Sequence, residues 1–195
     1  MKSQSPLNEI YKKGLYGDYE NKNEENLIKI QEVSNLSIFQ IVKYKNSKVS
    51  TNDLDIDGLK LSEKTNSVMT NGKTRILWFG PNNWLAVSED KNLFHKVNKN
   101  TKETDFAVTD LSNSRAIIEI EGKLIKEVLK KGCPFNFNEF KKNNCAGSVF
   151  HGINIVVDYV DDNPDTLNLF TLRSFGESFY HHITDAALEF GYMSV

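Results

Sequence analysis

The sequence predicts an α+β fold built from two similar halves, each an antiparallel sheet with helices packed on one face. A strand-turn-strand-helix pattern recurs over residues 75–97 and 146–190, and the strands come in hairpin pairs rather than alternating singly with helices. We expect residues 1–27 to be an N-terminal docking segment and linker, 28–105 the first half and 106–195 the second half.

The N-terminal segment has the signals of one short helix followed by a linker. Ser5 can cap a helix, Pro6 suits its first position, and Gly14 can end it. Residues 17–26 are charged and polar without periodicity, which is typical of a linker.

The first half centres on a predicted hairpin. Residues 75–79 contain four consecutive apolar residues, and the turn signal GPNN at 80–83 separates them from a returning strand over 84–87. A further strand is predicted over 36–44, whereas 45–71 is expected to be irregular, with one short helical turn near Leu59. Ser88 or Asp90 can cap a following helix, whose apolar residues Leu93, Phe94 and Val97 have helical spacing.

The second half is predicted to begin with another hairpin. Residues 106–111 form one strand, Ser112-Asn113-Ser114 the turn, and 115–121 the returning strand, with Ala116, Ile118 and Ile120 on one face. After Gly122 a helix is expected, with Leu124, Ile125, Val128 and Leu129 on its apolar side and a stop at Gly132.

The last part of the chain is predicted to form three strands and a helix. Two strands flank Gly152 within 146–160, and a loop over 161–165 leads to a strand over 167–172. Ser174 and Glu177 have the spacing of a capping box for a helix that ends near Phe190. Its predicted apolar stripe consists of Phe175, Phe179, Ile183, Ala186 and Phe190.

Composition excludes several classes of protein. The 195 residues carry a net charge of −2, which argues against a nucleic-acid binder with a strongly basic face. We see no apolar run of about 18 residues and no secretory signal, so neither a membrane span nor export is expected. Cys133 and Cys145 are the only cysteines and lie twelve residues apart, which predicts reduced thiols and a cytoplasmic protein.

The sequence offers no motif for phosphate binding or metal catalysis. It lacks the glycine-rich phosphate loops and the HExxH zinc motif. Adjacent His181 and His182 would point about 100° apart on a helix, which disfavours shared chelation. Cys133 and Asp110 fit turns better than catalytic roles. We therefore predict no catalytic, cofactor-binding or metal-binding residue in this chain.

Five residues are candidates for contact with a partner protein: Trp78, Trp84, Arg115, Arg173 and Leu188. The two tryptophans flank a tight turn, and cross-strand packing in the core is the alternative to a partner platform. Only three of the 24 basic residues are arginine, which hints at forked contacts that lysine cannot make, although chance is an equal alternative. Leu188 falls on the polar side of the last helix, as a scattered exposed leucine also could.

Four ordered stretches resemble one known family, the gamma subunits of heterotetrameric sarcosine oxidases. Residues 77–85, LWFGPNNWL, are similar to its L-W-L-G-P-x-E-W-L, and residues 110–116, DLSNSRA, to its D-[LV]-S-H-[GS]-R-[AT]. Residues 128–134, VLKKGCP, resemble V-L-x-x-G-C-P, and residues 173–178, RSFGES, resemble R-S-[FY]-x-[ED]-S. Asn83 and Asn113 depart from the family pattern, which often has Glu and His there.

The resemblance implies a fold related to folate-binding aminomethyltransferase domains. It also implies a complex of alpha, beta, gamma and delta chains that demethylates sarcosine to glycine, with formation of H2O2 and methylenetetrahydrofolate. FAD, FMN, NAD, tetrahydrofolate and zinc are then expected in the partner subunits and none in this chain. This chain would be the non-catalytic structural subunit.

Two other functions remain open at this point. One is a free-standing folate-binding protein of the aminomethyltransferase type. That protein would need a carboxylate to hold the pterin, for which Asp110 is the only candidate. The other is a homo-oligomeric scaffold without an enzyme partner.

Overall fold

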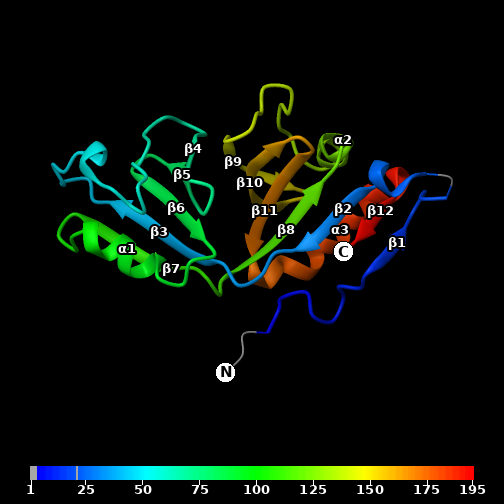
Figure 1. The fold of residues 1–195 in the computed structure, drawn as a ribbon, viewed down its shortest axis with the longest axis horizontal. Coiled ribbons are helices and arrows are strands. Elements are labelled where there is room, and N and C mark those ends of the chain that lie inside the picture. Colours follow the sequence, from blue (N-terminus) through cyan, green and yellow to red (C-terminus); the bar gives the residue numbers. More distant parts are fainter. Residues whose placement is uncertain (1–3, 21) are drawn as a thin grey trace. The chain divides into compact units, whose positions relative to one another are not determined.

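The computed structural model describes residues 4–20 and 22–195, which form two compact units (Figure 1). The seven-stranded unit comprises Met1–Ser34, Ser114–Lys142 and Gly147–Val195. The five-stranded unit comprises Asn35–Asn113 and Asn143–Ala146. Both sheets carry helices, in agreement with the predicted α+β class.

The seven-stranded unit is built around a mostly antiparallel sheet with the order β1-β12-β2-β8-β11-β10-β9 among the described residues. Strand β12, at the C-terminus, lies between two N-terminal strands, antiparallel to β1 and parallel to β2. The strands are β1 (Gly14–Tyr16), β2 (Ile28–Glu32), β8 (Arg115–Glu121), β9 (Cys145–Phe150), β10 (Ile153–Asp162), β11 (Asp165–Leu172) and β12 (Tyr192–Ser194).

The helical segments of this unit precede β2, follow β8, or lie between β11 and β12. They are η1 (Glu24–Asn26), α2 (Ile125–Lys130), η3 (Arg173–Phe175), α3 (Gly176–Ala187) and η4 (Leu188–Phe190). Helix α3 packs against β8 and β11, and its Phe179 and Ile183 are fully buried. The approach is close, because a Cβ on Gly176 would lie 3.0 Å from the Cβ of Ala116.

The five-stranded unit is an antiparallel sheet with the order β4-β5-β6-β3-β7 among the described residues. Helix α1 packs against β3 and buries Leu93 and Val97. The elements are β3 (Ser37–Lys43), η2 (Thr51–Asp53), β4 (Val68–Thr70), β5 (Thr74–Gly80), β6 (Asn83–Ser88), α1 (Leu93–Asn100) and β7 (Phe106–Asp110).

The core of this unit gathers residues from the sheet, from α1 and from the loop before β4. It consists of Phe39, Ile41, Leu54, Ile56, Leu59, Leu61, Ile76, Trp84, Ala86, Leu93, Val97 and Phe106. Four of these come from residues 54–61, a stretch that was expected to be irregular. The stretch is irregular in backbone but well packed, because its apolar residues alternate with polar ones.

The hairpin predicted over residues 106–121 is wrong. Strand β7 pairs with β3, whereas β8 pairs with β2 and β11, so the two strands belong to different sheets. The turn residues bind the five-stranded unit instead, because the Oγ of Ser112 accepts a hydrogen bond from the backbone N–H of Ile38 at 2.9 Å. The pairing of β2 with β8 also places residues 28–34 with the seven-stranded unit, not with the half expected over 28–105.

Two predicted helix starts are also corrected. Residues 5–11 form hydrogen-bonded turns rather than a helix, although the Oγ of Ser5 accepts from the N–H of Leu7 as a cap would. The capping box at Ser174 is absent: this residue lies in η3, and the N-cap position of α3 is Phe175, without a side-chain cap. Phe175 is 47% exposed and therefore lies outside the apolar stripe.

Candidate functional site

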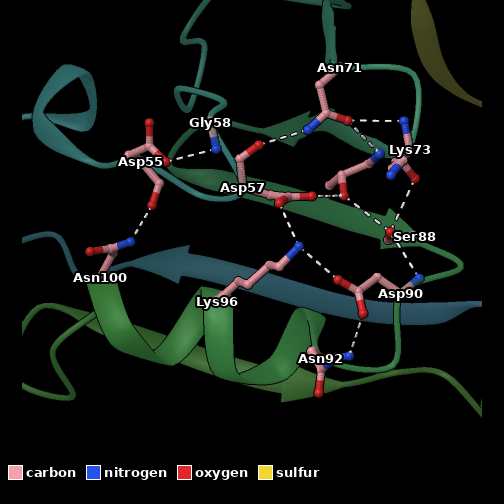
Figure 2. Close-up of polar contacts among 11 residues, drawn as sticks. Asp55, Asp57, Gly58, Asn71, Lys73, Ser88, Asp90, Asn92, Lys96 and Asn100 are labelled. Atoms are coloured by element: carbon pink, nitrogen blue, oxygen red, sulfur yellow. Dashed lines mark hydrogen bonds and ion pairs between the residues drawn. The ribbon is translucent and has the colours of Figure 1, made fainter.

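A polar cluster in the five-stranded unit is organised by Asp57 and Lys96 (Figure 2). The Nζ of Lys96, on α1, lies 2.6 Å from an Oδ of Asp57 and 2.7 Å from an Oδ of Asp90. Asp57 has a positive φ of 56° and lies in the loop that precedes β4. The lysine thus bridges two carboxylates from different loops.

Buried hydroxyls support the same cluster from the sheet. The Oγ1 of Thr74, on β5, donates to the second Oδ of Asp57 at 2.6 Å and lies 3.1 Å from the Oγ of Ser88 on β6. Asn71 donates from its amide to the backbone carbonyl of Asp57 at 2.7 Å, and its Oδ1 accepts from the N–H of Thr74 at 2.8 Å. The loop carrying Asp57 is therefore fixed to β5 and to α1, and Thr74 links it onward to Ser88 on β6 (Figure 2).

The electrostatics of this cluster favour ionised groups. Hydrogen bonds from Lys96, and then from Thr74, lower the pKa of Asp57. The hydrogen bond from Lys96 is also the main cause of the lowered pKa of Asp90, while Asp57 and Asp90 raise the pKa of Lys96. General acid–base catalysis works best with a pKa near the working pH, and these shifts lead away from it. The cluster is suited to holding the loop in place.

Neither cysteine has the surroundings of a nucleophile. Burial raises the pKa of the Cys133 thiol, whose Sγ lies 3.0 Å from the Oγ of Ser148. Cys145 is buried, and its thiol donates to the backbone carbonyl of Trp78 at 3.2 Å. A protonated, buried thiol reacts poorly.

The histidines form a pair that the sequence analysis missed. The rings of His151, in the β9–β10 turn, and His182, on α3, lie 5.1 Å apart, although the residues are 31 positions apart in the chain. Within residues 4–20 and 22–195, no three His, Cys, Asp or Glu side chains gather as they would around a metal ion. Over the same residues, no helix is both long and apolar enough to span a membrane.

The predicted partner-contact residues lie in both units. Trp84, on β6, is 1% exposed and donates from Nε1 to the carbonyl of Ser62 at 2.7 Å, so its side chain offers no surface to a partner. Trp78 faces it in register on β5 and is half-buried. Leu188, in η4, is 41% exposed.

The two remaining candidates come together at one end of the seven-stranded sheet. The backbone N–H of Arg173 donates to the carbonyl of Ser114 at 2.9 Å, which places Arg173 beside the start of β8. Its guanidinium also donates to the carbonyl of Gln4. The Arg115 side chain is half-buried and, among the described residues, makes no hydrogen bond or ion pair. Burial lowers the pKa of its guanidinium.

Asp110, the candidate folate carboxylate, has a turn role. It is exposed at the end of β7, and its Oδ1 accepts a hydrogen bond from the N–H of Ser112 at 2.8 Å. The bond fixes the loop that leaves β7.

The fold defines the class of protein to which the chain is similar. Aminomethyltransferase T of the glycine cleavage system from Bartonella henselae superposes with a TM-score of 0.65 at 12% identity, over 93% of this chain and 57% of that one. A chain of heterotetrameric sarcosine oxidase from Corynebacterium sp. U-96, in complex with pyrrole 2-carboxylate, superposes with a TM-score of 0.80 at 21% identity, over 96% and 95% of the two chains. The chain therefore has an aminomethyltransferase-like fold.

Sequence comparison specifies the family within that fold. The family model "Sarcosine oxidase, gamma subunit family" matches residues 53–189, so the chain belongs to this family. Sarcosine oxidase subunit gamma from Corynebacterium sp. (strain U-96) is 28% identical over 120 residues, which span 60% of this chain and 58% of that protein. The resemblance noted from the four sequence stretches is confirmed.

Proposed function

We propose that the chain is the non-catalytic gamma subunit of a four-chain sarcosine oxidase, assembling with alpha, beta and delta subunits in the cytoplasm. The complex would demethylate sarcosine to glycine, with formation of H2O2 and methylenetetrahydrofolate. FAD, FMN, NAD, tetrahydrofolate and zinc would be held by the partner subunits.

The observation that carries the proposal is the family match over residues 53–189. The chemistry of the described side chains supports a structural role. Lys96 forms ion pairs with both Asp57 and Asp90, Asp110 stabilises a turn, and the Cys133 thiol is buried. A catalytic site requires a nucleophile, base or cofactor contact arranged around a reacting atom.

Co-expression with the three partner subunits from the same source tests assembly. We expect the tagged chain to recover alpha, beta and delta subunits together, with flavin absorbance and sarcosine-dependent peroxide release in the recovered complex. A tagged chain that recovers no partner would contradict the proposal.

Measurements on the isolated chain test whether it has catalytic activity or binds a cofactor by itself. We expect no flavin absorbance, no peroxide release on addition of sarcosine, and no saturable binding in a titration with tetrahydrofolate. The similarity to aminomethyltransferase T gives the alternative, a free-standing folate-binding protein, a specific basis. Micromolar tetrahydrofolate binding that is lost in Asp110→Asn would favour that alternative.

A further inference from the structure

Arg115 differs from the paired cations of the seven-stranded unit. The Nζ of Lys29 lies 2.7 Å from the Oε1 of Glu121, and the Nζ of Lys126 lies 3.2 Å from the Oδ2 of Asp165. The guanidinium of Arg115 is half-buried, yet no carboxylate among the described residues lies within ion-pair distance. Removing a charge from water without a partner is costly. A carboxylate supplied from outside this unit would remove that cost.

Apolar surface lies directly beside this guanidinium. Arg115, the first residue of β8, is the register partner of Leu172, the last residue of β11. Directly opposed residues of antiparallel strands project from the same face with Cβ atoms about 4.5–5.5 Å apart. Leu172 is 43% exposed, so this neighbour leaves apolar surface open to a partner. Arginine next to an exposed leucine has the composition of an interface centre.

Arg173 does not compete for the same role. Its guanidinium already donates to the carbonyl of Gln4, and its backbone N–H donates to Ser114. It therefore stabilises the N-terminal segment and the start of β8 from within the unit. The two neighbouring arginines have different tasks, and Arg115 is the one with unused donors.

We propose that Arg115 and Leu172 form an anchor for a partner subunit of the oxidase, which inserts an aspartate or glutamate flanked by apolar side chains. This inference rests on the proposed function and adds the chemistry of the contact. The planar guanidinium binds a carboxylate through two parallel hydrogen bonds, and the apolar neighbours exclude water from the pair. A phosphate-bearing partner fits less well, because one free arginine among apolar residues provides little positive charge.

Recovery of the complex tests whether the anchor residues contribute to assembly more than other exposed residues do. In co-expression with the partner subunits, Arg115→Lys and Leu172→Ser should each lower recovery at least about tenfold, the effect of losing one interface centre. Leu124→Ser serves as the control, because Leu124 is 39% exposed in the same unit and lies outside the anchor. The melting temperatures of the isolated variants should equal that of the unsubstituted chain.

A photo-crosslink identifies the occupant. With p-benzoylphenylalanine in place of Leu172, irradiation of the assembled complex should join the chain to a partner peptide that contains Asp or Glu beside an apolar residue. A crosslinked peptide without a carboxylate, or normal recovery by both variants, would overturn the anchor while leaving the gamma-subunit function intact. A lowered melting temperature with normal recovery would show that Arg115 stabilises the fold instead. If the unsubstituted chain recovers no partner, the proposed function itself fails.

Discussion

At the scale of single residues, two glycines allow backbones to approach where a side chain would not fit. Gly17 has a φ of 71°, and a Cβ there would lie 2.1 Å from the carbonyl oxygen of Leu188. That oxygen accepts the backbone N–H of Asp18 at 2.8 Å, which fixes the approach. Gly191, with a φ of 69°, is equally crowded, since its Cβ would lie 2.4 Å from the carbonyl oxygen of Asp18.

Gly17→Ala should destabilise the seven-stranded unit more than Gly152→Ala. Both glycines have positive φ, but Gly152 has open space around the added Cβ. Gly152→Ala should therefore show only the backbone strain, about 1–2 kcal/mol. Gly17→Ala adds a steric clash and should exceed it by at least about 1 kcal/mol. Urea unfolding followed by far-UV circular dichroism measures both, and equal losses would contradict the close approach.

The Asp57 cluster predicts a pH-dependent stability. A carboxyl group whose pKa is lowered by folding stabilises the fold above its unfolded pKa, about 3.9 for Asp, and loses that contribution as pH falls through the lowered value. The pKa values of Asp57 and Asp90 are both lowered, chiefly by Lys96. Asp57→Asn should thus destabilise the five-stranded unit at pH 7, and its difference from the unsubstituted chain should shrink below about pH 4.

Denaturant midpoints at the two pH values check this expectation. Asp53→Asn is the control, because Asp53 is exposed in η2 of the same unit. If the difference in denaturant midpoint between Asp57→Asn and the unsubstituted chain is the same at pH 7 and pH 3, the ion pairs with Lys96 add nothing to stability.

How much of the candidate site could be predicted depended on how far apart its residues lie in the sequence. Arg115 was selected as a candidate because arginine is rare in this chain and the residue begins a predicted strand next to a turn. Asp57 and Lys96, which are 39 positions apart, were missed, because nothing in the local pattern links a loop aspartate to a lysine on α1. His151 and His182 were missed for the same reason.

At the scale of elements, two strands joined by a specific turn signal were predicted correctly. Which strand lies beside another in the sheet was not. The hairpin of β5 and β6 was expected from the GPNN turn and is present. Alternation in β8 was expected as well, but alternation identifies a half-buried strand without naming its neighbour, so its pairing with β7 was wrong. β1, β4 and β12 are three residues long, too short for any periodicity to be visible.

Helix α3 is held by its buried face and not by an N-cap. Ser174 lies in η3, one residue before the N-cap position Phe175, so Ser174→Ala should change stability by no more than about 0.5 kcal/mol. Phe179 is fully buried, and Phe179→Ala should cost about 3–5 kcal/mol. Thermal unfolding of the two variants measures the contrast. If Ser174→Ala loses more than about 1 kcal/mol of stability, Ser174 does act as the cap of the helix.

At the scale of the whole molecule, the five-stranded unit is largely an insertion in the seven-stranded one. Its main segment, Asn35–Asn113, begins just before β3 and ends just after β7, two strands that are paired with each other. The N–H of Leu111 also donates to the carbonyl of Ile38 at 2.8 Å, so the ends of the segment are tied together. Inserted segments with adjacent ends are commonly able to fold as units.

The positions of the tryptophans allow the two units to be followed separately. Trp78 and Trp84, the only tryptophans in the chain, both lie in the five-stranded unit. Because each unit buries its own apolar residues, we expect two unfolding transitions, of which tryptophan fluorescence reports one and far-UV circular dichroism both.

Single-unit variants decide whether the transitions are independent. Phe179→Ala should shift the circular dichroism transition of the seven-stranded unit and leave the fluorescence midpoint in place. Thr74→Val removes a buried hydroxyl that is bonded to Asp57. It should lower the fluorescence midpoint by the equivalent of about 1–3 kcal/mol. If both variants move both signals together, the chain unfolds as one cooperative unit. The paired ends of the Asn35–Asn113 segment would then not be enough to let it fold by itself.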